Sequence, residues 1–160
     1  DSREIRDDFG TLNTPLGKDN QIRGIHAHGL ASVCYEVLNR IVIDRQLGGA
    51  RAYEVDLAVQ HLPATQANDL LLLDRGYASD LRLATCIQPQ RPFVVRGSAG
   101  AFQTARPMLE GLGADNQVIN LTPSLGQRLT IIALGLPSVL TVRFVRVRLP
   151  NGELEVLVTH

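Results

Sequence analysis

The 160-residue sequence lacks most of the short motifs that identify a function directly. It has no Walker loop, no Gly-x-Gly-x-x-Gly, no Gly-x-Ser-x-Gly and no Cys-x-x-Cys, so the usual nucleotide, hydrolase and zinc signatures are excluded. Its two cysteines, Cys34 and Cys86, lie in apolar stretches without metal-ligand spacing. We interpret them as reduced core thiols, which favours a cytoplasmic setting.

Long apolar runs are absent as well. No segment approaches the roughly 18 consecutive apolar residues of a membrane helix, and the chain opens with Asp1, Arg3 and Glu4 instead of a signal sequence. We therefore expect no membrane-spanning segment. With 44% apolar residues the chain can form the core of one domain, and its start at Asp1 without methionine leads us to expect a piece of a longer protein.

The net charge is zero, but the charges are unevenly distributed. Residues 1–90 include nine basic and twelve acidic residues, whereas residues 91–150 include seven basic and two acidic ones. Fifteen of the sixteen basic residues are arginine, the side chain best suited to forked hydrogen bonding with phosphate. A GC-rich genome would produce the same preference, so composition alone leaves nucleic-acid binding open.

The first half of the chain alternates strand-like and helix-like segments. This alternation is typical of an α/β fold. The apolar spacing and the turn residues set the boundaries of each segment. In order, we predict a loop (1–20), two paired strands (24–39 and 40–47), a helix (51–62), a central strand buried on both faces (69–74), a helix capped by Ser79 (79–88) and a strand (91–97).

After Gly97 the pattern changes to short β-type runs separated by glycine, proline and asparagine. The last two runs flank Asn151-Gly152, which is the strongest short hairpin signal. A two-residue turn there would place Arg148 opposite Glu155, and Val147 opposite Val156. The predicted runs are 117–123, 129–134, 140–150 and 153–160.

Asp74 is the first candidate functional residue. In open α/β sheets ligands gather at the carboxyl ends of strands, and Asp74 directly follows the run Leu70–Leu73. The functional interpretation is a catalytic or metal-ligating carboxylate. The alternative is an acid that forms a turn or caps the helix beginning near Ser79. For Arg75 and Gly76, salt-bridging and turn-forming roles are favoured over phosphate contact.

The histidines give weaker signals. His26 and His28 are two residues apart, hence on one face of a strand, as a metal pair would be. No third ligand follows at a recognisable spacing, so hydrogen-bonded or solvent-facing roles are favoured. His61 ends a predicted helix, and we interpret it as a cation that interacts favourably with the helix dipole.

Five phrases of the sequence resemble the DDE transposases of the large insertion-sequence group called the four family. They occur in the family's order and at about its spacing, so the similarity spans nearly the whole chain. Any one phrase is a weak signal, whereas five in order are fairly specific. The phrases are DSREIRDDFG (1–10), YEVLNRIVID (35–44), YEVDLAVQHL (53–62), LLLLDRGY (70–77) and LTVRFVRVRLPNGELEVLVT (140–159).

The resemblance implies an α/β fold with a ribonuclease H-like mixed sheet and flanking helices, followed by a β-rich insertion with a C-terminal hairpin. Residues 1–96 would be part of the ribonuclease H-like catalytic core and residues 97–160 the β-rich insertion, together one fragment of a larger transposase. Asp74 matches the family's second catalytic Asp. In that family three carboxylates hold two divalent ions, Mg²⁺ or Mn²⁺, which activate the attacking group and stabilise the leaving oxygen.

The chain also departs from the family's pattern. Phe9-Gly10 follows Asp1 too closely for Asp1 to be the first catalytic Asp. The helix with Tyr, Arg, Glu and Lys that supplies the family's catalytic Glu is not present either. We expect both acids to lie outside these residues, so the fragment alone is expected to be inactive.

The resulting expectation is the central part of a DNA transposase that cuts and joins strands at insertion-sequence ends. Asp74 would be catalytic and would ligate metal, and Arg75, Arg143, Arg146 and Arg148 would contact DNA. The partners would be the double-stranded DNA of the element ends and of the target, with a homodimer on DNA and no membrane. The expected location is the bacterial cytoplasm, at the nucleoid when the enzyme acts.

Two alternatives remain beside this expectation. The chain could be a catalytically dead transposase remnant that acts only as a DNA-binding or interaction module. A different Asp-based phosphohydrolase would instead show Asp-x-Asp after a strand, where this chain has Asp74-Arg75-Gly76.

Overall fold

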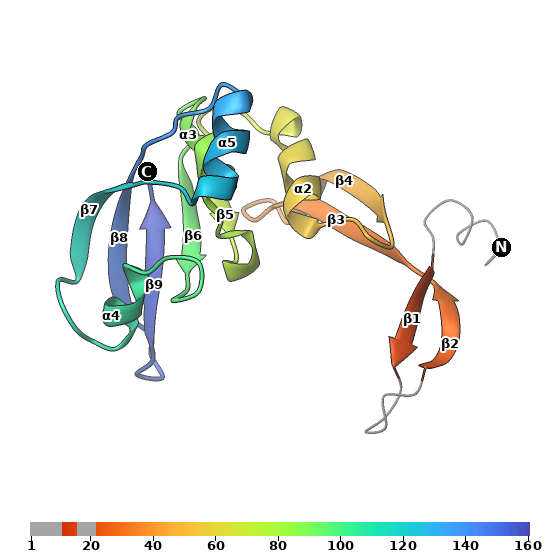
Figure 1. The fold of residues 1–160 in the computed structure, drawn as a ribbon, viewed down its shortest axis with the longest axis horizontal. Coiled ribbons are helices and arrows are strands. Elements are labelled where there is room, and N and C mark those ends of the chain that lie inside the picture. The colour runs from red at the N-terminus through yellow and green to blue at the C-terminus, as the bar shows by residue number, and fades with distance from the viewer. Residues whose placement is uncertain (1–10, 16–21) are drawn as a thin grey trace. The chain divides into compact units, whose positions relative to one another are not determined.

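A computed structural model describes residues 11–15 and 22–160, and the side chains of residues 28–160 (Figure 1). The contacts divide the chain into two compact units, residues 1–65 and 66–160, and each is described by itself. The predicted division after residue 96 follows the family's parts and stays a prediction. No helix among the described residues is long and apolar enough to cross a membrane.

The first unit contains two antiparallel strand pairs. The predicted loop over 1–20 lies largely outside the described residues, but Thr11–Pro15 forms strand β1, which pairs with β2 (Ile22–Ala27). The predicted strand over 24–39 is divided, because His28 lies between β2 and the next strand. The predicted pairing of this segment with the next one, 40–47, is confirmed, since β3 (Gly29–Glu36) pairs antiparallel with β4 (Ile41–Gly49).

One helix packs on this hairpin. α2 (Glu54–Gln60) lies within the predicted helix and contacts β3 and β4, with Leu57 buried between them. Pro63 lies in the 3-10 turn η1 (Leu62–Ala64) that follows α2. Proline cannot donate the next helical hydrogen bond, which accounts for the end of the helix near the predicted position.

The second unit contains a mixed five-stranded sheet in the order β5-β6-β9-β8-β7. β5 and β6 are parallel, and the other neighbouring pairs are antiparallel. Together with the helices this confirms the α/β class and the mixed sheet. The strands are β5 (Leu71–Leu73), β6 (Phe93–Gly97), β7 (Asn116–Leu121), β8 (Leu140–Arg148) and β9 (Leu154–Thr159).

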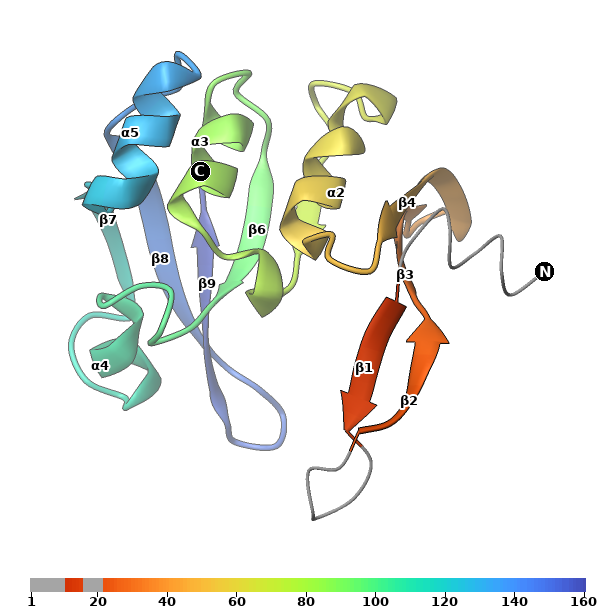
Figure 2. The ribbon, with the colours of Figure 1, turned by 45° about the vertical axis from the view of Figure 1, so that its right-hand side comes forward.

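Helices of the second unit cover one face of this sheet (Figure 2). The core between helices and sheet includes the fully buried Leu83, Phe93 and Phe144. Phe102 meets Phe144 edge to face, with ring centroids 5.6 Å apart, a favoured aromatic geometry. The helices are α3 (Asp80–Ile87), α4 (Ala105–Leu109) and α5 (Leu125–Ala133).

The predicted start of α3 is confirmed. The Ser79 hydroxyl oxygen accepts a hydrogen bond from the backbone N–H of Arg82 at 3.3 Å, which satisfies a donor that the first turn leaves without a helical partner. Both cysteines are free thiols, but only Cys86, on α3, is fully buried in the core as predicted, whereas Cys34 is half-buried. This burial raises the pKa of the Cys86 thiol.

The β-type run predicted over 129–134 is wrong, because these residues belong to α5. The helix ends at Ala133, and Gly135, two residues further, has a φ of +67° that suits glycine. The N–H of Gly135 donates to the carbonyl of Ile132, and that of Leu136 to the carbonyl of Ile131, both at 3.0 Å. This is a Schellman motif, and with the full burial of Ile131 it outweighs the β-propensity of the isoleucines.

The prediction of a central strand buried on both faces over 69–74 is also wrong. β5 stands at one end of the strand order, so it is an edge strand of the sheet that the described residues form. Leu71 and Leu73 pack against the core, whereas Leu70 and Leu72 are 55% and 62% exposed. A continuous leucine run is compatible with one open face, because the pattern itself does not reveal what covers each side.

The C-terminal hairpin is confirmed, but its register is one residue away from the predicted one. Val147 lies opposite Glu155, and Arg148 lies opposite Leu154. The predicted cross-strand pair of Arg148 with Glu155 is therefore not formed.

Proline explains this difference in register. A two-residue turn at Asn151-Gly152 would need a hydrogen bond from the N–H that Pro150 lacks. Instead the N–H of Leu149 donates to the carbonyl of Glu153 at 2.8 Å, and the N–H of Gly152 donates to the carbonyl of Leu149 at 2.9 Å. With Gly152 at φ +88° this is a three-residue loop with a left-handed third residue.

Candidate functional site

Asp74 occupies the first position after β5, at the carboxyl end of that strand. The 3-10 turn η2 (Arg75–Tyr77) follows at once, and the N–H of Tyr77 donates to the Asp74 carbonyl at 2.9 Å. The turn leaves the Asp74 side chain at the strand end, 66% exposed. A ligand can therefore reach this carboxylate, as predicted for an acid at a strand end, while its metal and catalytic roles stay predictions.

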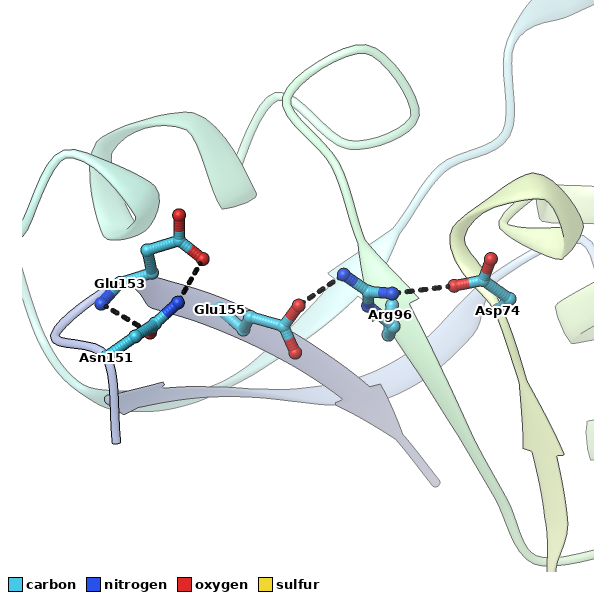
Figure 3. Close-up of polar contacts among 5 residues, drawn as sticks. All are labelled: Asp74, Arg96, Asn151, Glu153 and Glu155. Atoms are coloured by element: carbon cyan, nitrogen blue, oxygen red, sulfur yellow. Dashed lines mark hydrogen bonds and ion pairs between the residues drawn. The ribbon is translucent and has the colours of Figure 1, made fainter. Parts of the chain in front are cut away.

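Asp74 forms part of a chain of three charged side chains (Figure 3). The guanidinium of Arg96 donates from Nη1 to Oδ1 of Asp74 at 3.1 Å. Its Nη2 donates to Oε1 of Glu155. The exposed fraction of the side chain is 66% for Asp74, 44% for Arg96 and 17% for Glu155. One cation thus connects an exposed carboxylate to a largely buried one.

The sheet brings these three residues together because β6 lies between β5 and β9. Arg96 is in register with Leu157 on β9, and Glu155, two residues before Leu157, points to the same face. Val95, next to Arg96, and Val156, next to Glu155, are buried on the face that the helices cover. The charged chain therefore lies on the opposite, open face of the sheet.

The pKa of Asp74 is lowered from its usual value. The largest cause is a hydrogen bond from the backbone N–H of Arg75, which outweighs the opposing effect of desolvation, and the charge and hydrogen bond of Arg96 lower the pKa further. Asp74 is therefore fully ionised at neutral pH. An ionised carboxylate is the form that binds a cation.

An open hollow of about 300 Å³ lies beside this carboxylate. Its lining combines the acid and the base with apolar side chains of two neighbouring strands. The lining residues are Leu72, Leu73, Asp74, Val94 and Arg96.

As a metal ligand, Asp74 fits one position of a coordination shell. Its exposed, ionised oxygens are the ligand type that Mg²⁺ prefers. In the part of the chain that the structure describes, no three His, Cys, Asp or Glu residues form a group that could hold a metal ion. The described residues therefore do not form a complete metal site around Asp74.

The four arginines predicted to contact DNA lie in different environments. Arg75 is exposed in η2, and Arg143 is exposed on the open sheet face, where its Nε donates to Asn116 Oδ1 at 2.8 Å. Arg148 is exposed at the end of β8, and its Nη1 donates to the carbonyl of Gly152 at 3.0 Å. None of these contacts tests DNA binding, which stays a prediction.

Arg146 differs from the other three, because its side chain is only 14% exposed. It lies on the helix-covered side, where Nη1 donates to the carbonyls of Leu112 at 3.0 Å and Met108 at 3.4 Å, and Nη2 pairs with Asp115. These contacts fasten the segment after α4 to β8. They favour a structural role over the predicted contact with phosphate.

Sequence reasoning missed the connection between Asp74 and Glu155. The sequence identified Arg96 only as one of the seven basic residues of the segment 91–150. Glu155 was predicted to pair with Arg148, because the hairpin register was predicted wrongly. The order of strands in the sheet decides this contact, because it places β9 directly beside β6. The only sequence signals of this contact were that Arg96 and Glu155 both lie in predicted strands.

A second polar cluster lies in the first unit. Nδ1 of His61 is 2.7 Å from Oδ2 of Asp44, and Nε2 is 3.0 Å from the hydroxyl oxygen of Ser32. The order Ser, His, Asp matches that of an activated nucleophile. However, Ser32 and His61 are 7% and 6% exposed, and the hydroxyl lies between the hairpin and the C-terminal end of α2. A reacting carbonyl has no approach to it, so we assign the cluster a structural role.

His61 follows the last residue of α2, at the helix end as predicted, and this cluster gives it contacts that the sequence did not reveal. Its role as a cation stays a prediction. Its ring is buried and hydrogen-bonded at both nitrogens. The hydrogen bond from His61 is the largest cause that lowers the pKa of Asp44, followed by one from Gln46. The other histidine hypothesis concerned His26 and His28. These two do not share one strand, and the His26 side chain lies outside the described residues.

Comparisons of this chain with protein-family models, with curated proteins and with solved structures found no match.

Proposed function

We propose that this chain is the central part of a DNA transposase catalytic domain, with a ribonuclease H-like core and a β-rich insertion, and that Asp74 is one of its metal-ligating carboxylates. The observation that supports the proposal is the position of Asp74, an exposed and ionised acid at the carboxyl end of β5. It lies within LLLLDRGY, one of five ordered phrases that resemble the family.

The local topology agrees with this proposal. β5 and β6 are parallel and joined through α3, which is a βαβ unit. In such sheets ligands bind beyond the carboxyl ends of the strands, where Asp74 lies. The β-type segments from β7 to β9 then extend the same sheet.

The residues of the chain have distinct parts in the proposed reaction. Asp74 supplies oxygen ligands and a negative charge, and the N–H of Arg75 with the Arg96 guanidinium keeps that carboxylate ionised. A divalent ion, when bound, supplies activation of a water or 3′-hydroxyl and stabilisation of the leaving oxygen. The exposed Arg75 and Arg143 neutralise DNA phosphates.

The test is strand cleavage by the protein that contains this chain. Replacing Asp74→Asn keeps the shape but removes the charge, so cleavage of an element end in Mg²⁺ should be lost while DNA binding is retained. Asp69→Asn is the matched control, because Asp69 lies at the other end of the same leucine run and its carboxylate accepts from the N–H of Gln66. Undiminished cleavage by the Asp74→Asn protein would remove the catalytic role.

A catalytically dead remnant is the second candidate, and one observation favours it. Asp74 already has a cationic partner in Arg96, and the described residues hold no three-residue metal group. The two candidates differ in the flanking reading frame. An Asp-Gly-Ser or Asp-Gly-Thr phrase upstream and a helix with Tyr, Arg, Glu and Lys downstream support the enzyme, and the lack of either supports the remnant.

A further inference from the structure

Glu155 is the most buried member of the charged chain that ends on Asp74, with 17% of its side chain exposed. It lies on β9, in the middle of the sheet order, and accepts from Nη2 of Arg96. Arg96 uses its other terminal nitrogen, Nη1, for Asp74. Because a guanidinium is planar, fixing Nη2 on Glu155 also fixes the direction of Nη1.

We propose that Glu155 is a positioning residue that controls, through Arg96, how readily Asp74 binds a divalent cation. This inference rests on the proposed function, in which Asp74 is a metal ligand. Glu155 itself does not touch the cation. It holds the guanidinium that competes with the cation for the Asp74 carboxylate.

The competition follows from the shared carboxylate. Arg96 occupies Oδ1 of Asp74 by a hydrogen bond of 3.1 Å between exposed groups, which a cation can displace. When Asp74 releases it, Arg96 still has Glu155 as its partner, so no charge is left without a counter-ion. Without Glu155 the guanidinium would have Asp74 as its sole carboxylate partner in this chain of contacts, and displacement would become harder.

This mechanism predicts effects of opposite sign. Arg96→Gln removes the competitor and should tighten the binding of Mn²⁺ at Asp74 about two- to fivefold, the range expected for an exposed ion pair. Glu155→Gln leaves Arg96 to Asp74 alone and should weaken Mn²⁺ binding by a similar factor. In the double variant Glu155→Gln should have no further effect, because Glu155 acts only through Arg96.

Two matched controls separate this mechanism from general electrostatics. Arg143→Gln removes a cation from the same open sheet face, where Arg143 bonds Asn116. Glu153→Gln removes an acid two residues from Glu155, and Glu153 bonds Asn151 in the hairpin loop instead (Figure 3). Neither control should change the affinity for Mn²⁺ at Asp74 by more than a small fraction of the Arg96 effect.

The experiment titrates the intact protein that contains this chain with Mn²⁺ and follows the broadening of the backbone amide NMR signals of Leu73 and Arg75. Asp74→Asn shows whether the broadening depends on that carboxylate, and the amide spectrum of each variant shows that it is folded. The opposite shifts, together with a silent Glu155→Gln in the Arg96→Gln background, are the expected result. If Glu155→Gln weakens binding equally in both backgrounds, it acts directly by its charge and the positioning role is wrong.

Failure of the inference is distinguishable from failure of the proposed function. Mn²⁺ binding that depends on Asp74 but is indifferent to Glu155→Gln overturns only the positioning role. No broadening near Asp74 in any variant overturns the inference and also removes support for the metal role. The proposed function is then tested independently by strand cleavage with the intact protein and its Asp74→Asn variant.

Discussion

Replacing Arg146→Ala should destabilise the protein, although Arg146 was predicted to contact DNA. Its side chain is 14% exposed and donates to the carbonyls of Leu112 and Met108 and to Asp115. Loss of hydrogen bonds from a charged donor costs about 1.5 to 3 kcal/mol. Two details reduce the expected loss of stability. The Met108 carbonyl still accepts a hydrogen bond from the N–H of Gly111 at 3.1 Å. Asp115 is 72% exposed, so its ion pair with Arg146 contributes only about 0 to 1 kcal/mol.

The expected loss in the free energy of unfolding is therefore about 2 kcal/mol. Urea unfolding of the 160-residue chain measures it, and with a slope of about 2 kcal/mol per molar the midpoint should fall by about 1 M. Arg143→Ala is the control, because Arg143 is exposed and makes one side-chain hydrogen bond, so it should stay within about 0.5 kcal/mol of the parent. Equal stability of the Arg146→Ala and Arg143→Ala proteins would refute the structural role of Arg146.

Three further predictions use other parts of the molecule. When the intact protein binds DNA, the logarithm of its affinity should fall linearly with the logarithm of the salt concentration. Arg143→Ala should make this slope less steep by about 1, because one phosphate contact is lost. An unchanged slope would exclude that contact. The pKa of Asp44 is lowered by the hydrogen bond from His61, so its stabilising effect should be full above the unfolded-state pKa of about 3.9 and should be lost as the pH falls through the lower folded-state pKa. Urea unfolding of the parent and of Asp44→Asn between pH 7 and 2 should show a difference that shrinks at the acid end, and a constant difference would contradict the linkage. Gly135→Ala should lower the free energy of unfolding, measured in urea, by about 1 kcal/mol, because Gly135 has a φ of +67°. Its added Cβ would meet open space, so the cost is purely conformational. Gly126→Ala inside α5 is the control; its Cβ also meets open space, and it should be neutral or stabilising.

Local signals predicted most of the elements around the candidate site. Ser79 marks the start of α3 because its hydroxyl caps the first turn, and Pro63 marks the end of the helical segment before it. Short β-type runs next to turn residues predicted the strands that became β6 and β9. Each of these signals acts within a few residues of the chain, so no knowledge of the fold was needed.

The predictions that were wrong or incomplete concern features that depend on contacts between residues distant in the sequence, or on competing local signals. The burial of the run Leu70–Leu73 depends on β5 being an edge strand, which only the strand order decides. The partner of Glu155 changed because Pro150 has no N–H and moves the hairpin register by one residue. The hydrogen bond of His61 to Asp44 was not predicted, because Asp44 lies 17 residues earlier in the sequence.

Strand cleavage in Mg²⁺ by the intact protein with Asp74→Asn, beside its Asp69→Asn control, tests the central claim most directly. Loss of a ligand that stabilises charge on the reacting phosphate is worth several kcal/mol, so we expect the single-turnover rate to fall by about a thousandfold or more with DNA affinity nearly unchanged. The Asp69→Asn protein should cleave at the parental rate. Cleavage by the Asp74→Asn protein within about threefold of the parent would contradict the assignment of Asp74 as a catalytic metal ligand.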